Sequence, residues 1–147
     1  MFKRILIPTD GSPIARKGIK TGVALAKALG ASVVGYYAVE PIEQLYYSLG
    51  ESARAGKVEA IEKRLRDLGM QYVDQIRKAA TAAGVAAEVV MTSSSDPFHG
   101  IVEAARKQRC DVICMASHGR GQVVSALLGN VTQKVLAHSD IPVLVCR

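Results

Sequence analysis

Glycine is the most informative residue type in the stretch 115–130, which reads Met-Ala-Ser-His-Gly-Arg-Gly-Gln-Val-Val-Ser-Ala-Leu-Leu-Gly-Asn and follows a short apolar run. Gly119 and Gly121 allow the backbone to approach a ligand closely or to adopt positive φ. Gly129 and Asn130 stand where the next helix is expected to begin. A helix N-terminus offers free N–H groups and a partial positive charge to a phosphate. These residue types therefore favour an anion-binding loop.

The charges near this loop are consistent with an anion. Between Val112 and Ser139 the sequence has no Asp or Glu, whereas Arg120 and Lys134 are basic. The same pattern is equally typical of a glycine-rich turn with Asn130 as an ordinary helix cap. Two common phosphate-binding motifs do not apply, because the chain lacks GxxxxGK(S/T) and its GRGQVV segment lacks the third glycine of GxGxxG.

A second candidate loop follows the first predicted strand, where the sequence reads Pro8-Thr9-Asp10-Gly11-Ser12. The carboxylate of Asp10 could accept hydrogen bonds from ribose hydroxyls or a base amine. Asp10 and Ser12 are also residue types that cap a helix N-terminus. Ligand binding and helix capping remain alternatives for this loop.

A hydrolase would need a nucleophile, and Ser117 on the expected strand-to-helix turn resembles a nucleophile elbow. However, Met115 stands where that motif has glycine. The candidate partners downstream, His138 and Asp140, would crowd into one helix end. We therefore expect no dedicated catalytic residues.

Segments typical of strands and helices alternate along the chain. Strands are predicted within residues 2–8, 31–41, 85–94, 111–117 and 141–147, and helices at 13–30, from Val58 to near Gly84, from 97 to about 108, and at 130–138. Residues 41–55 show no regular pattern. Ser12 and Asp96 are expected as N-caps, followed by Pro13 and Pro97 as first helical residues.

This alternation predicts a parallel sheet with helices on both faces. The chain has 147 residues, of which 49% are hydrophobic, which suits one domain with a single core. We expect a single α/β domain over residues 1–147, doubly wound and flavodoxin-like, with a five-stranded parallel sheet. Ligands bind such sheets at the carboxyl ends of the strands. The two candidate loops follow strands 1 and 4, which we expect to be neighbours.

The net charge is +6 and the pI about 9.4, which raises the question of a polyanionic partner. Arg16, Lys17, Lys20 and Lys27 fall along one predicted helix without interleaved aromatic residues. This arrangement favours a solvated helix face over a specific nucleic-acid site. A diffuse attraction for anions, nucleotides included, fits both interpretations.

Membrane, metal and disulfide patterns are not recognisable. No apolar run approaches the roughly 20 residues that cross a membrane, and we expect no signal peptide. Cys110, Cys114 and Cys146 form no CxxC pair and are typical of reduced thiols in a cytoplasmic protein. If the chain is extended from Cys110 to Cys114, these two side chains would point to one side of the strand. The histidines lack the spacing of a zinc site.

Three segments together resemble the universal stress protein family. ILIPTDGS is similar to the family's opening strand and acidic loop, MASHGRGQVVSALLGNVTQKVL to its nucleotide loop, and SDIPVLVCR to its closing strand. The resemblance covers the whole chain and implies the adenine nucleotide alpha hydrolase-like form of the doubly wound fold.

The ATP-binding members of this family carry the pattern G-x2-G-x9-G-(S/T). The corresponding residues here are Ala116, Gly119, Gly129 and Asn130, with both spacings intact. Asn130 keeps a donor and an acceptor in place of the family's hydroxyl. Ala116 places a Cβ where the ligand would lie against the backbone.

The resemblance implies that the chain binds ATP or AMP, with Mg²⁺ or Mn²⁺ as an additional ion held through the phosphates. The implied binding residues are Asp10 for the ribose, Pro8, Thr9, Ala38 and Met115 for the adenine, Ala116 at the end of the fourth strand, and Gly119, Gly129, Asn130, Val131 and Thr132 for the phosphates. Arg120 is added from its charge alone. At most we expect slow ATP hydrolysis, for which His118 is the nearby base.

Members of the family usually dimerise through the last strand. The resemblance therefore implies a homodimer through Pro142–Arg147 and a role in regulating the stress response in the cytoplasm. A member of the same fold that binds no nucleotide and acts as a protein-interaction module is the alternative, and the departures at Ala116 and Asn130 motivate it.

Overall fold

Strands and helices alternate in the computed structural model, which describes residues 1–43, 47, 51–119 and 128–147, with side chains 51–55 left aside. The elements are β1 (Arg4–Pro8), α1 (Ala15–Leu29), β2 (Ser32–Val39), α3 (Glu51–Ala82), β3 (Ala87–Ser93), α4 (Pro97–Lys107), β4 (Val112–Ala116), α5 (Asn130–His138) and β5 (Val143–Cys146). Within the described residues, no helix is both long enough and apolar enough to span a membrane.

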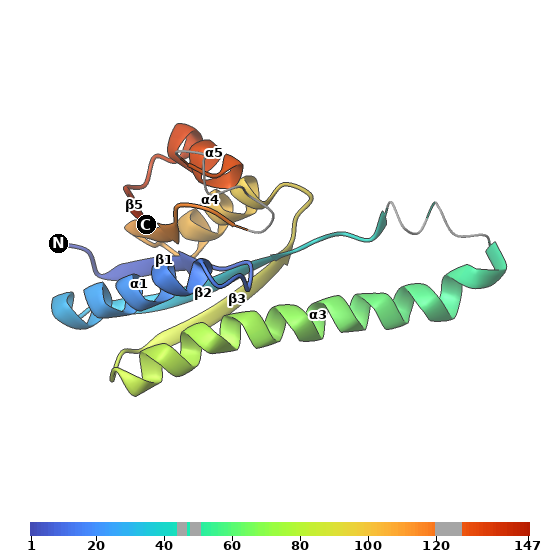
Figure 1. Ribbon diagram of the computed structural model, residues 1–147, viewed down its shortest axis with the longest axis horizontal. Helices are drawn as coiled ribbons and strands as arrows, with labels where there is room; N and C mark the ends of the chain where they lie inside the picture. Colours follow the sequence, from blue (N-terminus) through green and yellow to red (C-terminus); the bar gives the residue numbers. More distant parts are fainter. Residues whose placement is uncertain (44–46, 48–50, 120–127) are drawn as a thin grey trace.

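The five strands form one all-parallel sheet in the order β3-β2-β1-β4-β5 (Figure 1). The chain winds outward from β1 to β3 in one direction and then continues from β4 to β5 in the other. This reversal confirms the predicted doubly wound α/β fold. It also makes β1 and β4 neighbours, as expected, so the topological switch point lies between them.

Two apolar layers fill the space between the sheet and its helices. Ile5, Ile7 and Val33 point toward α1 and α3, whereas Leu6 and Val34 point toward α4 and α5. The alternation follows from the two-residue period of a strand. Because both faces are covered, β4 is buried along its whole length, as its apolar sequence predicts.

The ends of α1 show how local sequence sets an element. The helix begins at Ala15, two residues later than predicted, although the Ser12 hydroxyl still accepts a hydrogen bond from the Ala15 N–H at 3.2 Å. It ends at Gly30, whose φ of 65° is the left-handed conformation that glycine adopts at low cost. The helix terminus predicted at this glycine is therefore confirmed.

Helix α3 departs from the prediction, because it begins at Glu51 and not at Val58. Its first part projects away from the body of the domain (Figure 1). An apolar stripe is expected only where a helix packs against a core. The segment 51–57 reads ESARAGK and has no large apolar residue, so the hydrophobic periodicity used for the prediction begins only at Val58.

The expectation that Cys110 and Cys114 face one side of a strand is wrong. Cys110 precedes β4 and belongs to the turn that ends α4, where its N–H donates to the Ala105 carbonyl at 2.8 Å. Its thiol packs in the α4/α5 layer, whereas Cys114 packs in the α1/α3 layer. All three cysteines are buried and free.

Candidate functional site

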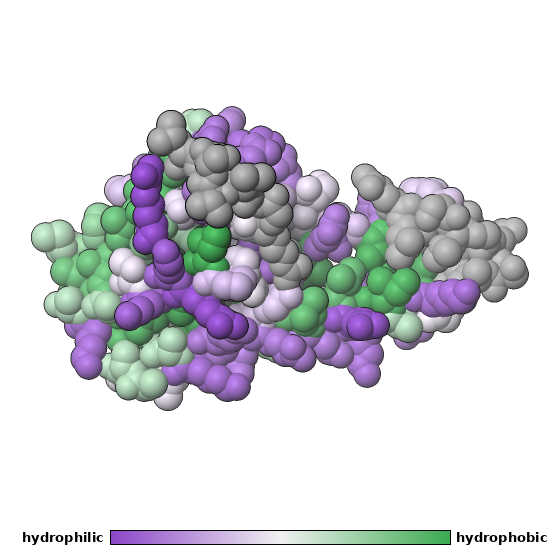
Figure 2. Space-filling view, in the orientation of Figure 1, coloured by the Kyte–Doolittle hydropathy of each residue, from purple (hydrophilic) through white to green (hydrophobic). Residues whose placement is uncertain are grey.

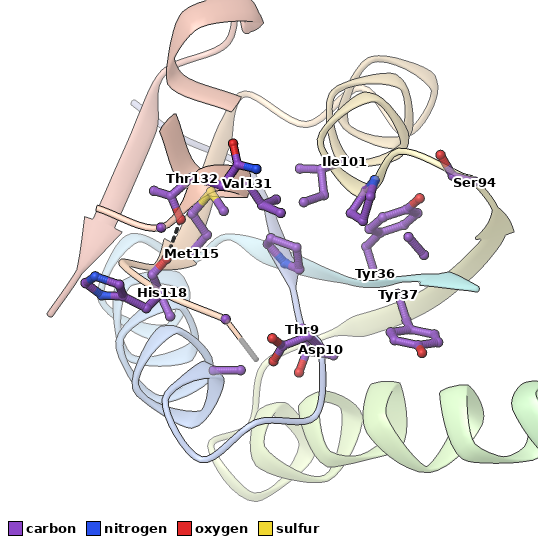
Figure 3. A pocket seen from close by; sticks show the side chains of 18 of the residues that line it. Thr9, Asp10, Tyr36, Tyr37, Ser94, Ile101, Met115, His118, Val131 and Thr132 are labelled. Carbon is purple, nitrogen blue, oxygen red and sulfur yellow. Dashed lines mark hydrogen bonds between the residues drawn. The ribbon is translucent and has the colours of Figure 1, made fainter. Parts of the chain in front are cut away.

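A cavity of about 370 Å³ opens at the carboxyl ends of β1, β2 and β4 (Figure 3). This volume lies within the range of roughly 300–1,000 Å³ that is common for small-molecule sites. The wall residues are Pro8, Thr9, Asp10, Ala15, Tyr36, Tyr37, Ala38, Glu40, Ser94, Ser95, Pro97, Ile101, Met115, Ala116, His118, Gly119, Gly129, Asn130, Val131 and Thr132.

All but one of the predicted site residues line this one cavity. They come from segments more than a hundred residues apart in the sequence, and the adjacency of β1 and β4 brings them together. The exception is Arg120, which lies outside the described residues. The geometry assembles the predicted set, and its binding role stays a prediction.

Backbone hydrogen bonds fix the loop after β1. The Thr9 N–H donates to the Tyr36 carbonyl at 2.9 Å. The Gly11 N–H donates to the Thr9 hydroxyl at 3.1 Å, and the Ser12 N–H donates to Asp10 Oδ1 at 2.9 Å. Asp10 therefore holds a turn with one carboxylate oxygen, while Ser12 serves the helix start.

The second carboxylate oxygen of Asp10 lies against Gly119. A Cβ built on Gly119 would be 2.6 Å from Asp10 Oδ2, closer than real Cβ contacts occur. Any side chain at position 119 would therefore force the Asp10 carboxylate to shift. Figure 3 shows Thr9 and Asp10 on one side of the cavity and Val131 and Thr132 on the other.

The start of α5 is tied to the end of β4. The Gly129 N–H donates to the Ser117 carbonyl at 2.7 Å, and the Thr132 hydroxyl donates to the Ala116 carbonyl at 3.1 Å (Figure 3). Among the described residues no side chain caps α5, and the first turn of the helix carries no acidic residue. The first N–H groups of a helix have no partner within the helix, so this wall of the cavity presents backbone donors and partial positive charge.

Ala116 departs from the glycine of the family pattern at the edge of the cavity. Strand alternation places its methyl group on the α1 face together with Cys114, whereas Met115 points toward α4 and α5. Ala116 nevertheless lines the same cavity as Val131 and Thr132.

Two carboxylates, Asp10 and Glu40, give the described part of the wall its negative charge, and no Lys or Arg belongs to it. The Tyr36 hydroxyl bonds the Thr92 hydroxyl at 2.7 Å, and burial raises the pKa of Tyr36 above its ordinary value. Tyr36 is thus a neutral wall residue at physiological pH. Among described residues, no cluster of three or more His, Cys, Asp or Glu side chains could hold a metal ion.

Several wall residues were not predicted from the sequence, among them Tyr36, Tyr37, Glu40, Ser94 and Ile101. Tyr36, Tyr37 and Glu40 lie on or directly after β2. The carboxyl end of β2 is at the same edge of the sheet as the carboxyl ends of β1 and β4. Applying the carboxyl-end rule to every strand, and not only to those bordering the switch point, would have found Glu40 and Ser94. Ile101 projects from α4, and no sequence signal identifies it.

The residues considered for a hydrolase are not arranged as a triad. The Ser117 hydroxyl is buried and hydrogen-bonds to His118 Nδ1 at 2.9 Å. His138 Nδ1 contacts the Lys134 carbonyl at 2.8 Å, and Asp140 pairs with Arg106 at 3.1 Å. Ser117, His138 and Asp140 are thus each paired with a different neighbouring residue, and these pairings do not form a Ser-His-Asp chain.

Comparison with known proteins gives a family match over the entire chain, because the Universal stress protein family profile matches residues 1–147. A universal stress protein of Thermus aquaticus is 34% identical, with full coverage of both chains. A universal stress protein of Methanocaldococcus jannaschii is 31% identical and is aligned over the whole of this chain and 83% of its own.

Solved structures show the same fold. A second Methanocaldococcus jannaschii universal stress protein superposes with a TM-score of 0.82 at 27% identity, over 99% of this chain and 96% of that chain. A universal stress protein solved in complex with cAMP superposes with a TM-score of 0.65 at 22% identity, over 99% and 97% of the two chains. An Archaeoglobus fulgidus member was solved with dAMP.

Proposed function

The chain belongs to the universal stress protein family, and from this premise we propose that it binds an adenine nucleotide, ATP or AMP, in the cavity at the carboxyl ends of β1 and β4. The observation that carries the proposal is the pairing of two opposite walls. One wall presents the carboxylate of Asp10, and the other presents the uncapped N-terminus of α5.

Each wall suits a different part of a nucleotide. The carboxylate of Asp10 is an acceptor suited to ribose hydroxyls. The backbone N–H groups at Asn130 and Val131 are donors suited to phosphate oxygens. Pro8, Ala38 and Met115 supply the apolar wall on which adenine would lie. The cAMP and dAMP complexes of the two structural neighbours support the same ligand class.

The residues of the cavity wall also indicate how a metal ion would have to be bound. The described residues offer no protein cluster for a metal, and the wall carries two carboxylates without a described Lys or Arg. Mg²⁺ or Mn²⁺ would therefore be held through the phosphates of ATP, whose negative charge it would offset. Ser117 is buried against His118, and the proposed role is regulatory binding without a dedicated nucleophile.

The proposed assembly is a homodimer through β5. This strand forms one edge of the sheet, so its outer backbone groups can pair with a second copy. Leu144 on β5 and Leu136 on α5 are exposed by 39% and 42%, which supplies apolar area beside the edge. The free thiols fit the proposed cytoplasmic location.

Thermal unfolding with and without nucleotide tests the binding proposal. A nucleotide at a hundred times its dissociation constant stabilises the folded state by about 2.7 kcal/mol, which raises Tm by roughly 5–10 °C for a chain of this size. We expect Asp10→Ala to lose most of this shift. Asp67→Ala, which removes an exposed carboxylate from α3, is the matched control and should keep it. No shift in the wild-type protein at millimolar ATP or AMP would refute the proposal.

A member that binds no nucleotide is the second candidate, and Ala116 and Asn130 are the observations that favour it. The double change Ala116→Gly, Asn130→Ser restores the residue types of the family pattern. Nucleotide binding by this variant and not by the parent would establish the second candidate. Equal binding by both proteins would exclude it.

A further inference from the structure

Another cavity, of about 500 Å³, is an open groove between α1 and α3, separate from the nucleotide cavity. We call it the α1/α3 groove. Its residues are Arg16, Ile19, Lys20, Val23, Ala24, Lys27, Gln75, Ala79 and Ala83. None of them belongs to the wall of the nucleotide cavity, so the proposed nucleotide site does not account for this groove.

The groove is hollow because small residues face each other across it. Ala24 on α1 lies opposite Ala79 and Ala83 at the end of α3, and the floor is formed by Ile19 and Val23, each 5% exposed. Figure 2 shows pale hydrophobic surface crossed by hydrophilic side chains at the lower left, where Figure 1 places α1 and the end of α3.

One wall of the groove carries a row of cations. Arg16, Lys20 and Lys27 are spaced four and seven residues apart, so they fall within a narrow stripe of α1 and span about 16 Å along its axis. Helix α1 contains no acidic residue, and no acidic residue lines the groove. The row is therefore not neutralised from within its own helix.

These cations also have no ion pair within the described part of the chain, although basic residues elsewhere do. Arg4 pairs with Glu88 at 2.7 Å, Lys107 with Glu103 at 3.0 Å, and Asp74 with Arg77 and Lys78 at 3.4 and 3.1 Å. An uncompensated row beside an apolar groove is complementary to a ligand with several acids and an apolar face.

The shape and composition of the groove select among anionic partners. Nucleic acid would need aromatic side chains for stacking, and none lines the groove. A lipid surface would need large apolar side chains that protrude, whereas the floor here is recessed. An amphiphile with a single anionic head would engage one cation and leave the rest of the row unused.

A second copy of this chain does not supply an acidic helix that could occupy the groove. Helices α1 and α5 have no acidic residue, α4 has Glu103 against two basic residues, and α3 has more basic than acidic residues. None of these helices thus presents a net negative face to the α1/α3 groove.

We propose that the α1/α3 groove docks an acidic amphipathic helix of a partner protein. The apolar face of that helix lies on Ile19, Val23 and the facing alanines, and its acidic flank meets Arg16, Lys20 and Lys27 along three turns. The groove then gives a nucleotide-binding domain a surface through which it engages another protein.

The test uses a fluorescein-labelled helical peptide of about four turns, with a Leu and Ala face and a Glu flank, and measures anisotropy against the full chain. We expect binding that weakens as NaCl rises. The Lys20→Glu/Lys27→Glu variant should bind about tenfold more weakly or worse, because attraction becomes repulsion. Ala24→Phe, which fills the groove without changing charge, should weaken binding about fivefold.

The matched control is Lys57→Glu/Lys63→Glu, which changes the net charge equally at exposed α3 positions outside the groove. It should bind the peptide as the wild type does. Equal weakening by both charge variants, or full binding by Ala24→Phe, would overturn the groove as the docking site. Absence of peptide binding, or binding of laurate or anionic vesicles in its place, would overturn the helical partner. Circular dichroism of each variant verifies folding.

Discussion

Substituting Gly119 by alanine tests the contact between the two loops of the proposed nucleotide cavity. The new Cβ would be 2.6 Å from Asp10 Oδ2 and 3.6 Å from Asp10 Cγ. The Asp10 carboxylate must therefore move by about 0.5–1 Å to restore an ordinary van der Waals contact with the new methyl group. The same movement strains the 2.9 Å hydrogen bond from the Ser12 N–H to Asp10 Oδ1.

The magnitude follows from what Asp10 is proposed to bind. A hydrogen bond to a charged group contributes about 1.5–3 kcal/mol, so losing one to the ribose lowers nucleotide affinity about tenfold to a hundredfold. The strained turn costs the fold itself about 1 kcal/mol. The affinity loss should therefore exceed the stability loss.

Displacement of a fluorescent AMP analogue by AMP measures the affinity, and urea unfolding measures the stability. The control is Gly56→Ala in α3, where an added Cβ meets nothing within 4 Å. That change should leave affinity unchanged and stabilise the helix by about 0.5–1 kcal/mol. If Gly119→Ala binds AMP as tightly as the wild type, Asp10 is not a nucleotide ligand.

Three further predictions concern the dimer, the wall and a buried thiol. Leu144→Asp on the edge strand should convert the proposed dimer to a monomer in sedimentation velocity, and an unchanged mass would argue against a β5 interface. Tyr36→Phe removes the 2.7 Å bond to the Thr92 hydroxyl and should lower unfolding stability by about 1 kcal/mol; no loss in urea unfolding would contradict that role. Burial raises the pKa of Cys110 from 9.0 to about 11, so the folded state resists ionisation and stability should fall as pH rises from 9 to 11. Cys110→Ala should reduce the slope of the unfolding free energy against pH over this range. An unaltered slope would show that Cys110 does not cause the loss of stability.

Much of the fold is predictable because its signals are local or topological. Gly30 ends α1 through its backbone conformation, and the apolar run of β4 reflects burial on both faces. The adjacency of β1 and β4 follows once the alternation of strands and helices is assigned to a doubly wound sheet that reverses direction after its first half. The start of α3 and the opposite placement of Cys110 and Cys114 depend on where elements project or turn, which hydrophobic periodicity does not encode.

The candidate site was predictable where one strand end carries its own chemistry. Asp10 and Gly119 are each recognisable by type, and the fold brings them into contact. Tyr36 and Ile101 carry no such signal, because their place in the wall depends on how β2 and α4 pack around the switch point. The α1/α3 groove likewise required the structure, since its alanines become informative only when two helices face each other.

Isothermal titration of the wild-type protein with AMP and with ATP, at near-physiological salt, tests the central claim most directly. The walls formed by Asp10 and by the N-terminus of α5 predict saturable binding of one adenine nucleotide per protomer. Absence of heat and of saturation with both nucleotides at millimolar concentration would contradict it.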